Sequence, residues 1–74
     1  MPKPTLQQRL VDALVTSGRG TIVPIRSRKY ITLERPDASF FYVGKAGALR
    51  FGKTVADSMA APAEFKKRLL DEAG

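Results

Sequence analysis

KYITLERPDASFFYVGKAGALRF, residues 29–51, decides the fold that this sequence predicts. Apolar and polar residues alternate along much of this stretch, and the alternation is interrupted at Pro36-Asp37 and again at residues 44–47. Alternation with a period of two is typical of strands, and turn-forming residues between such runs predict tight connections. The stretch therefore predicts three consecutive strands that pair in antiparallel order.

Helical periodicity precedes this stretch. Leucines recur at helical spacing across residues 5–17, which predicts a helix with one apolar face. Thr5 with Gln8 has the pattern of a capping box, because a threonine hydroxyl can accept from a backbone amide of the first turn. Gly18 follows and supplies a left-handed stop. The first element is therefore predicted to be a helix.

Weaker signals complete the chain. Val23 and Ile25 predict a first strand, and Pro24 between them favours the edge of the sheet. Residues 52–61 predict only a connector, and Pro62 suits the first turn of a closing helix. The side chains that we expect in the core are Leu10, Leu14, Ile31, Leu33, Val43, Phe65 and Leu69.

The order of elements is thus α-β-β-β-(β)-α within a single domain, residues 1–74. The fold class predicted is a small two-layer α+β domain, in which two helices cover one face of an antiparallel meander sheet. The other face of the sheet is left to solvent. A chain of this size has room for one small core.

Composition excludes several functions. The chain has no Cys and no His, so it builds neither a disulfide nor a Cys/His zinc site, and it lacks the commonest general base. No apolar run reaches the length of a membrane span. We expect no cofactor, no metal, no catalytic residue and no membrane contact, and the absence of Cys favours the cytoplasm.

GALRFGKT, residues 47–54, fits the phosphate-loop pattern G-x-x-x-x-G-K-[ST]. That pattern binds nucleotides where a strand leads through a glycine-rich loop into a long helix. Here the middle residues alternate like a strand, and Pro62 interrupts the sequence soon afterwards. We therefore expect a hairpin in this place and no nucleotide.

Positive charge is concentrated in the predicted sheet. Residues 19–53 hold eight basic and two acidic residues, which equals the net charge of +6 of the whole chain. Alternation places Arg28, Tyr30, Thr32, Phe40, Tyr42 and Arg50 on the face away from the helices. Bases stack on aromatic rings, and Lys or Arg neutralises phosphate.

This face predicts a small basic nucleic-acid-binding protein without catalytic activity, whose partner is RNA or single-stranded DNA. The residues expected to bind are Arg26, Arg28, Lys29, Tyr30, Tyr42, Lys45, Arg50 and Lys53. The basic residues 66–68 of the closing helix are interpreted as a complement to the helix dipole and as a solvated face.

Two alternatives remain open at this point. A basic surface can serve solubility or a protein partner, so a protein-interaction module or a structural protein is the second hypothesis. A nuclease without His is the third, and it would use Tyr30 with Lys29 and a carboxylate, or a metal held by acidic residues. The acidic residues Glu34, Asp37 and Asp57 stand at isolated positions, however, and no spacing obliges them to converge.

The element order, with Ser27-Arg28-Lys29-Tyr30 after the first strand and a closing helix that ends in LLDEAG, resembles the HicA-type toxins. These are small mRNA interferases with a fold like that of double-stranded-RNA-binding domains, and a Gly-Ser-His motif holds their catalytic His. Arg28 or Lys29 occupies the position of that His here. The resemblance therefore implies RNA affinity without cleavage. The stretch 29–53 is also similar to short proteins of phages and prophages.

Overall fold

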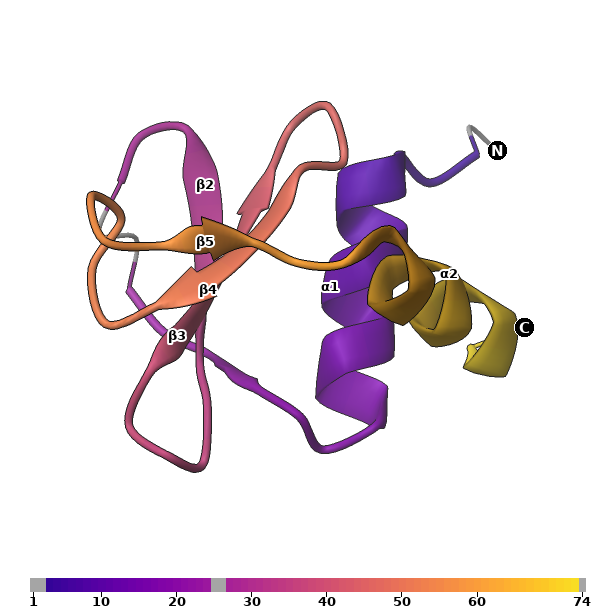
Figure 1. The fold of residues 1–74 in the computed structure, drawn as a ribbon. Coiled ribbons are helices and arrows are strands. Elements are labelled where there is room, and N and C mark those ends of the chain that lie inside the picture. The colour runs from indigo at the N-terminus through magenta and orange to yellow at the C-terminus, as the bar shows by residue number, and fades with distance from the viewer. Residues whose placement is uncertain (1–2, 25–26, 74) are drawn as a thin grey trace.

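The structure, a computed structural model, describes residues 3–24 and 27–73 (Figure 1). Its elements are α1 (Leu6–Thr16), β1 (Thr21–Ile22), β2 (Tyr30–Glu34), β3 (Phe40–Gly44), β4 (Leu49–Gly52), β5 (Met59–Ala60) and α2 (Ala63–Glu72). The five strands form one antiparallel sheet in the order of the sequence, and both helices lie on the same side of it. The predicted α+β fold is confirmed. Within the described residues, neither helix has the length and apolar character that crossing a bilayer requires.

Helix α1 begins where its sequence predicts. The hydroxyl of Thr5 accepts a hydrogen bond from the backbone N–H of Gln8 at 3.1 Å, which satisfies one of the free amides of the first turn. The amide side chain of Gln8 donates to Asp12 one turn further along. Thr5 is therefore the N-cap, as predicted, but the Gln8 side chain bonds to Asp12 and does not complete the capping box among the described residues.

The end of α1 is a Schellman motif. The backbone N–H of Gly18 donates to the carbonyl of Val15, and the N–H of Arg19 donates to the carbonyl of Leu14. Gly18 has a φ of 73°, a left-handed conformation that glycine adopts without strain. The predicted stop is confirmed, and the motif turns the chain towards β1.

The register of the three central strands agrees with the predicted alternation. Leu33 of β2 pairs with Phe41 of β3, and Val43 of β3 pairs with Leu49 of β4. The residues on the face towards the helices are Ile31, Leu33, Phe41, Val43, Leu49 and Phe51. Because side chains alternate along a strand, the residues between them lie on the opposite face, which we call the outer face.

The first strand begins earlier than predicted. β1 comprises Thr21–Ile22, and it pairs with β2 at the edge of the sheet. Val23 follows the strand and still donates its N–H to the carbonyl of Thr32 at 3.1 Å. Ile25 lies outside the described residues. The edge position that Pro24 indicated is confirmed, whereas the strand itself lies before Val23.

The opposite edge strand, β5, was predicted as a connector. Met59 pairs with Phe51 and Ala60 pairs with Arg50. A strand of two residues is too short to show alternation, so its sequence has no recognisable period. It forms because residues 53–58 bring the chain back beside β4. The sheet therefore has five strands.

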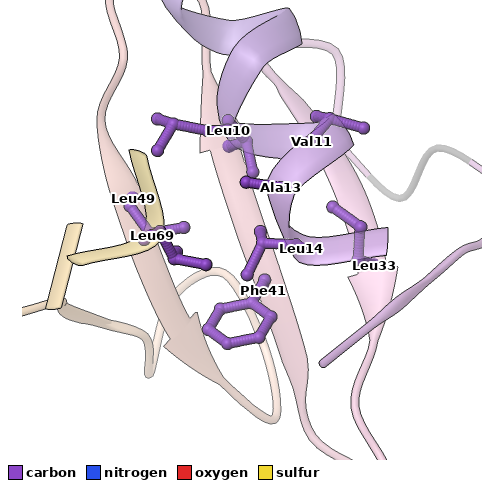
Figure 2. Close-up of a cluster of buried hydrophobic side chains, with 9 residues drawn as sticks. Leu10, Val11, Ala13, Leu14, Leu33, Phe41, Leu49 and Leu69 are labelled. Carbon is purple, nitrogen blue, oxygen red and sulfur yellow. The ribbon is translucent and has the colours of Figure 1, made fainter. Parts of the chain in front are cut away.

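The core lies between the helices and the sheet (Figure 2). Its fully buried residues come from both layers: Leu10, Val11, Ala13, Leu14, Leu33, Phe41, Val43, Leu49 and Leu69. Ile31 and Phe65, which were also predicted to be buried, are half-buried and pack against this cluster. The ring of Phe65 stacks on Phe41 with centroids 6.0 Å apart, which joins α2 to the middle of the sheet.

The turn between β3 and β4 is fixed against the start of α1. Gly47 has a φ of 85°, and a side chain there would overlap Leu6 of α1. The side-chain amide nitrogen of Gln7, Nε2, donates to the backbone carbonyl of Val43 at 2.9 Å. The stretch GALRFGKT thus comprises the end of this turn, strand β4 and the turn after it. The hairpin prediction is confirmed, since no helix follows directly as a phosphate loop requires.

The outer face was predicted to be open to solvent, and this prediction is wrong at its centre. Thr32, Phe40 and Tyr42 are buried there, and Tyr42 is only 1% exposed. The connection between β4 and β5 lies on the side of the sheet away from the helices (Figure 1). It is held by Arg50, which donates to the hydroxyl and the carbonyl of Ser58 at 2.8 and 2.6 Å. Alternation shows which face a side chain is on, but not what covers that face.

Candidate nucleic-acid interface

Tyr30, the first residue of β2, is the half-buried tyrosine of the outer face. Its ring packs over Gly44 of β3, where a Cβ atom would lie 3.3 Å from the ring. The ring of Tyr42 meets it edge to face, with centroids 6.2 Å apart. Tyr30 is therefore supported from the sheet side, and its remaining surface borders two hollows in the molecular surface.

The first of these, which we call the cationic hollow, has a volume of about 330 Å³. Its basic side chains are Arg28 and Lys29, which precede β2, and Lys45, which lies in the turn between β3 and β4. All three are exposed. The pairing of β2 with β3 brings them together, because Tyr30 stands opposite Gly44. Three cations from two segments favour an anionic ligand.

The second, which we call the apolar hollow, has a volume of about 520 Å³ and lies between the sheet and α2. Small and aliphatic side chains form most of its lining: Ala48, Leu49, Ala60, Ala61, Ala63 and Leu70. Lys66 and Lys67 of α2 also line it, together with Arg50 and Tyr30. This hollow combines an apolar surface with cations.

Tyr30 and Ala48 border both hollows, so the two hollows are neighbours, and we call them together the basic groove. Its charged side chains are Arg28, Lys29, Lys45, Arg50, Lys66 and Lys67, and none of the described residues that line it is acidic. Like charges on the walls of a hollow reinforce one another and concentrate counter-ions there. The geometry can therefore bind a ligand that carries several negative charges and a flat apolar part.

Arg50 of the groove also stabilises the connection between β4 and β5. Its Nε donates to the Ser58 hydroxyl at 2.8 Å, and a terminal nitrogen donates to the Ser58 carbonyl at 2.6 Å. Ser58 is itself buried and donates its hydroxyl to the carbonyl of Val55. Arg50 therefore fixes the connection between β4 and β5, and its charge contributes to the groove from a rigid position.

The structure brings together most of the residues that the sequence predicted as a site. Arg28, Lys29, Tyr30, Lys45 and Arg50 all line the basic groove.

Two of the predicted residues are placed otherwise, and a third is not described. Tyr42 lies beside Tyr30 on the outer face, and because it is 1% exposed it has no free ring face for a base. Lys53 is exposed on the turn after β4 and does not line either hollow. Arg26 lies outside the described residues. The expected stacking surface of several aromatic rings thus reduces to Tyr30 alone.

The sequence interpretation missed Lys66 and Lys67. They were assigned to the helix dipole and to a solvated face. The dipole role is wrong, because the last turn of α2 contains no basic residue, whereas Lys67 and Arg68 are indeed exposed. A signal was present in the spacing. Ala63, Lys66, Lys67 and Leu70 are separated by three, one and three positions, which places them on one stripe of a helix. That stripe faces the apolar hollow.

Two of the three acidic residues that were considered for catalysis serve turns. Asp37 accepts from the hydroxyl and the backbone N–H of Ser39, and these hydrogen bonds, aided by Arg35, lower the pKa of the Asp37 carboxyl. Asp57 accepts a hydrogen bond from Thr54 at 3.1 Å. In the part of the chain that the structure describes, no group of three or more acidic side chains could hold a metal ion.

Comparisons with known proteins do not assign a function to the groove. No family model, no curated protein and no solved structure matches the chain.

Proposed function

We propose that this protein is a small, non-catalytic nucleic-acid-binding protein that holds single-stranded RNA or DNA in its basic groove. One observation carries the proposal: a supported tyrosine ring, Tyr30, borders two hollows whose described lining residues include six cations and no acidic residue. Stacking on an aromatic ring and neutralisation of phosphate are the two interactions by which proteins hold single strands without regard to sequence.

The charges of Arg28 and of the four lysines of the groove are available to a ligand. The ion pairs among the described residues join Arg19 to Glu72 and Arg35 to Asp37, and neither pair uses a residue of the groove. Lys45 and Lys67 are exposed, so neutralising them by phosphate releases counter-ions without a large desolvation cost.

A single strand fits this surface better than a duplex does. The ring of Tyr30 is half-buried at the junction of two hollows, so only a base that has left its stack can reach it. The resemblance to the HicA-type toxins adds an expectation of RNA affinity. Residence in the cytoplasm and a relation to phage proteins belong to the same proposal and rest on the sequence.

The test is a titration of fluorescently labelled RNA and DNA oligonucleotides at several salt concentrations. Binding should weaken steeply as salt rises, and Lys45→Ala should lower the slope of log K against log salt by about 0.7, the value for one phosphate contact to a single strand. Lys53→Ala is the matched control, because Lys53 is an exposed lysine outside the groove. Absence of binding at low salt, or equal effects of the two substitutions, would contradict the proposal.

A protein partner is the second candidate, and a different observation favours it. Ile22 of β1 and Met59 of β5 are 57% and 68% exposed, and they occupy the two edge strands of the sheet. Exposed apolar side chains on edge strands are a common feature of protein–protein contacts. Such binding should be nearly independent of salt, lost in Met59→Ser or Ile22→Ser, and unaffected by Lys45→Ala.

A further inference from the structure

We infer that the smallest ligand that fills the basic groove is one nucleotide with a phosphate on each side. Its base would lie in the apolar hollow against Tyr30, with one phosphate in the cationic hollow and the other at Lys66 and Lys67. This inference rests on the proposed function and adds to it the arrangement and the size of the ligand. It also assigns a binding role to α2, whose basic residues were not predicted as part of the site.

The base is assigned to the apolar hollow because of the residues that surround it. Three alanines from the segment 60–63, with Ala48 opposite, leave room that larger side chains would fill. Leu49 and Leu70 complete an apolar wall, and Tyr30 offers a ring. A nucleobase is flat and apolar on its two faces, so it gains both burial and stacking here. The cationic hollow is smaller, and three of its seven lining residues are charged.

The cations fall into two groups, of which one lines the hollow next to the base and the other lines the hollow assigned to the base. Arg28, Lys29 and Lys45 line only the cationic hollow, whereas Lys66 and Lys67 line only the apolar hollow. A mononucleotide has one phosphate and can engage one group. A nucleotide within a strand has a phosphate on its 5′ and its 3′ side, so it can engage both.

Arg50 does not supply a third phosphate contact in this arrangement. Its guanidinium is held by two hydrogen bonds to Ser58, and releasing it would free the connection between β4 and β5. Its position beside the apolar hollow adds positive potential near the base and the second phosphate. The free lysines of α2 are therefore the donors that remain for that phosphate.

The experiment uses the tyrosine emission of the protein, since the chain has two tyrosines and no tryptophan. In the variant Tyr42→Phe, Tyr30 is the only tyrosine. Thymidine 3′,5′-bisphosphate and thymidine 5′-monophosphate are titrated separately. We expect both to quench the emission, because the base stacks on Tyr30, and the bisphosphate to bind about tenfold more tightly, as one further charge-assisted contact provides.

Variants of α2 then test the second phosphate. Lys66→Ala and Lys67→Ala, each in the Tyr42→Phe background, should bring the affinity for the bisphosphate close to that for the monophosphate. Arg68→Ala is the matched control, because Arg68 is the next residue of the same helix, exposed and outside both hollows. In the reciprocal variant Tyr30→Phe, the remaining Tyr42 is buried and its emission should not respond.

The outcomes separate this inference from the function on which it rests. Equal affinity for the two nucleotides, or an effect of Arg68→Ala as large as that of Lys67→Ala, overturns the inference while the binding of oligonucleotides still supports the proposed function. Binding of oligonucleotides without any change in Tyr30 emission also overturns it. If the wild-type protein binds neither oligonucleotides nor the bisphosphate, both the inference and the proposed function fail.

Discussion

The rings of Tyr30 and Tyr42 meet edge to face, with centroids 6.2 Å apart and planes inclined at 73°. The two residues belong to neighbouring strands and share the outer face of the sheet. Yet Tyr42 is buried, whereas Tyr30 is half-buried and borders both hollows of the groove. One tyrosine therefore supports the sheet, and the other is available to a ligand.

Alanine substitutions should separate these two tasks. Tyr42→Ala removes a fully buried ring and should lower the free energy of unfolding by about 3–5 kcal/mol. Tyr30→Ala should cost less stability and lower the affinity for an oligonucleotide by ~1–3 kcal/mol, the usual contribution of one stacked base. Urea denaturation and oligonucleotide titration measure the two quantities. If Tyr30→Ala binds as the wild type does, the ring is not part of the interface.

Two glycines with left-handed backbones should respond differently to substitution. Gly18→Ala meets no atom within 4 Å, so its cost is that of the backbone conformation, about 1–2 kcal/mol. Gly47→Ala has the same backbone cost, and its Cβ would also overlap the side chain of Leu6. We expect a total of about 2–4 kcal/mol for Gly47→Ala in urea denaturation.

Gly47→Ala also tests how the β3–β4 turn is fixed to α1. Combining it with Leu6→Ala should recover part of the loss, because the smaller side chain makes room for the new methyl group. Equal destabilisation by Gly18→Ala and Gly47→Ala would show that the turn does not contact α1 as closely as described.

The hydroxyl of Thr32 should destabilise the protein. Thr32 is fully buried in the outer face, and its Oγ1 atom has no hydrogen-bond partner among the described residues. Thr32→Val keeps the shape of the side chain and removes the unpaired group, so it should raise the free energy of unfolding by about 1 kcal/mol. Thr21→Val, on exposed β1, is the control and should change stability by no more than about 0.5 kcal/mol. A less stable Thr32→Val variant would contradict this assignment.

Acid should weaken the turn between β2 and β3. Hydrogen bonds from Ser39, followed by the charge of Arg35, lower the pKa of Asp37 below its ordinary value of 3.8. A lowered folded pKa means that the ionised carboxylate stabilises the fold above pH 3.8, and that this contribution is lost as pH falls through the folded pKa. Thermal unfolding from pH 7 to pH 2 should therefore show Asp37→Asn less stable than the wild type at neutral pH and equal to it in acid. A constant difference would contradict the role of the charge.

Local sequence patterns were sufficient to predict the helix layer and the sheet layer of the fold. The spacing of the leucines and the capping residues Thr5 and Gly18 determined the first helix, because a helix and its caps involve residues within a few positions of one another. Alternation determined which side chains of β2, β3 and β4 face the helices, because successive side chains of any strand point to opposite sides. The two-residue strand β5 gave no such pattern, since it depends on its pairing with β4.

The candidate site was likewise predictable only in part from the sequence. From the sequence alone, the excess of positive charge in residues 19–53 and the side of the sheet that carries Tyr30 could be predicted. Only the tertiary structure decided that Tyr42 is buried and that Lys66 and Lys67 line the groove beside Tyr30. Charge and alternation are properties of neighbouring residues, whereas burial and the hollow that Tyr30 shares with α2 depend on how distant segments of the chain pack together.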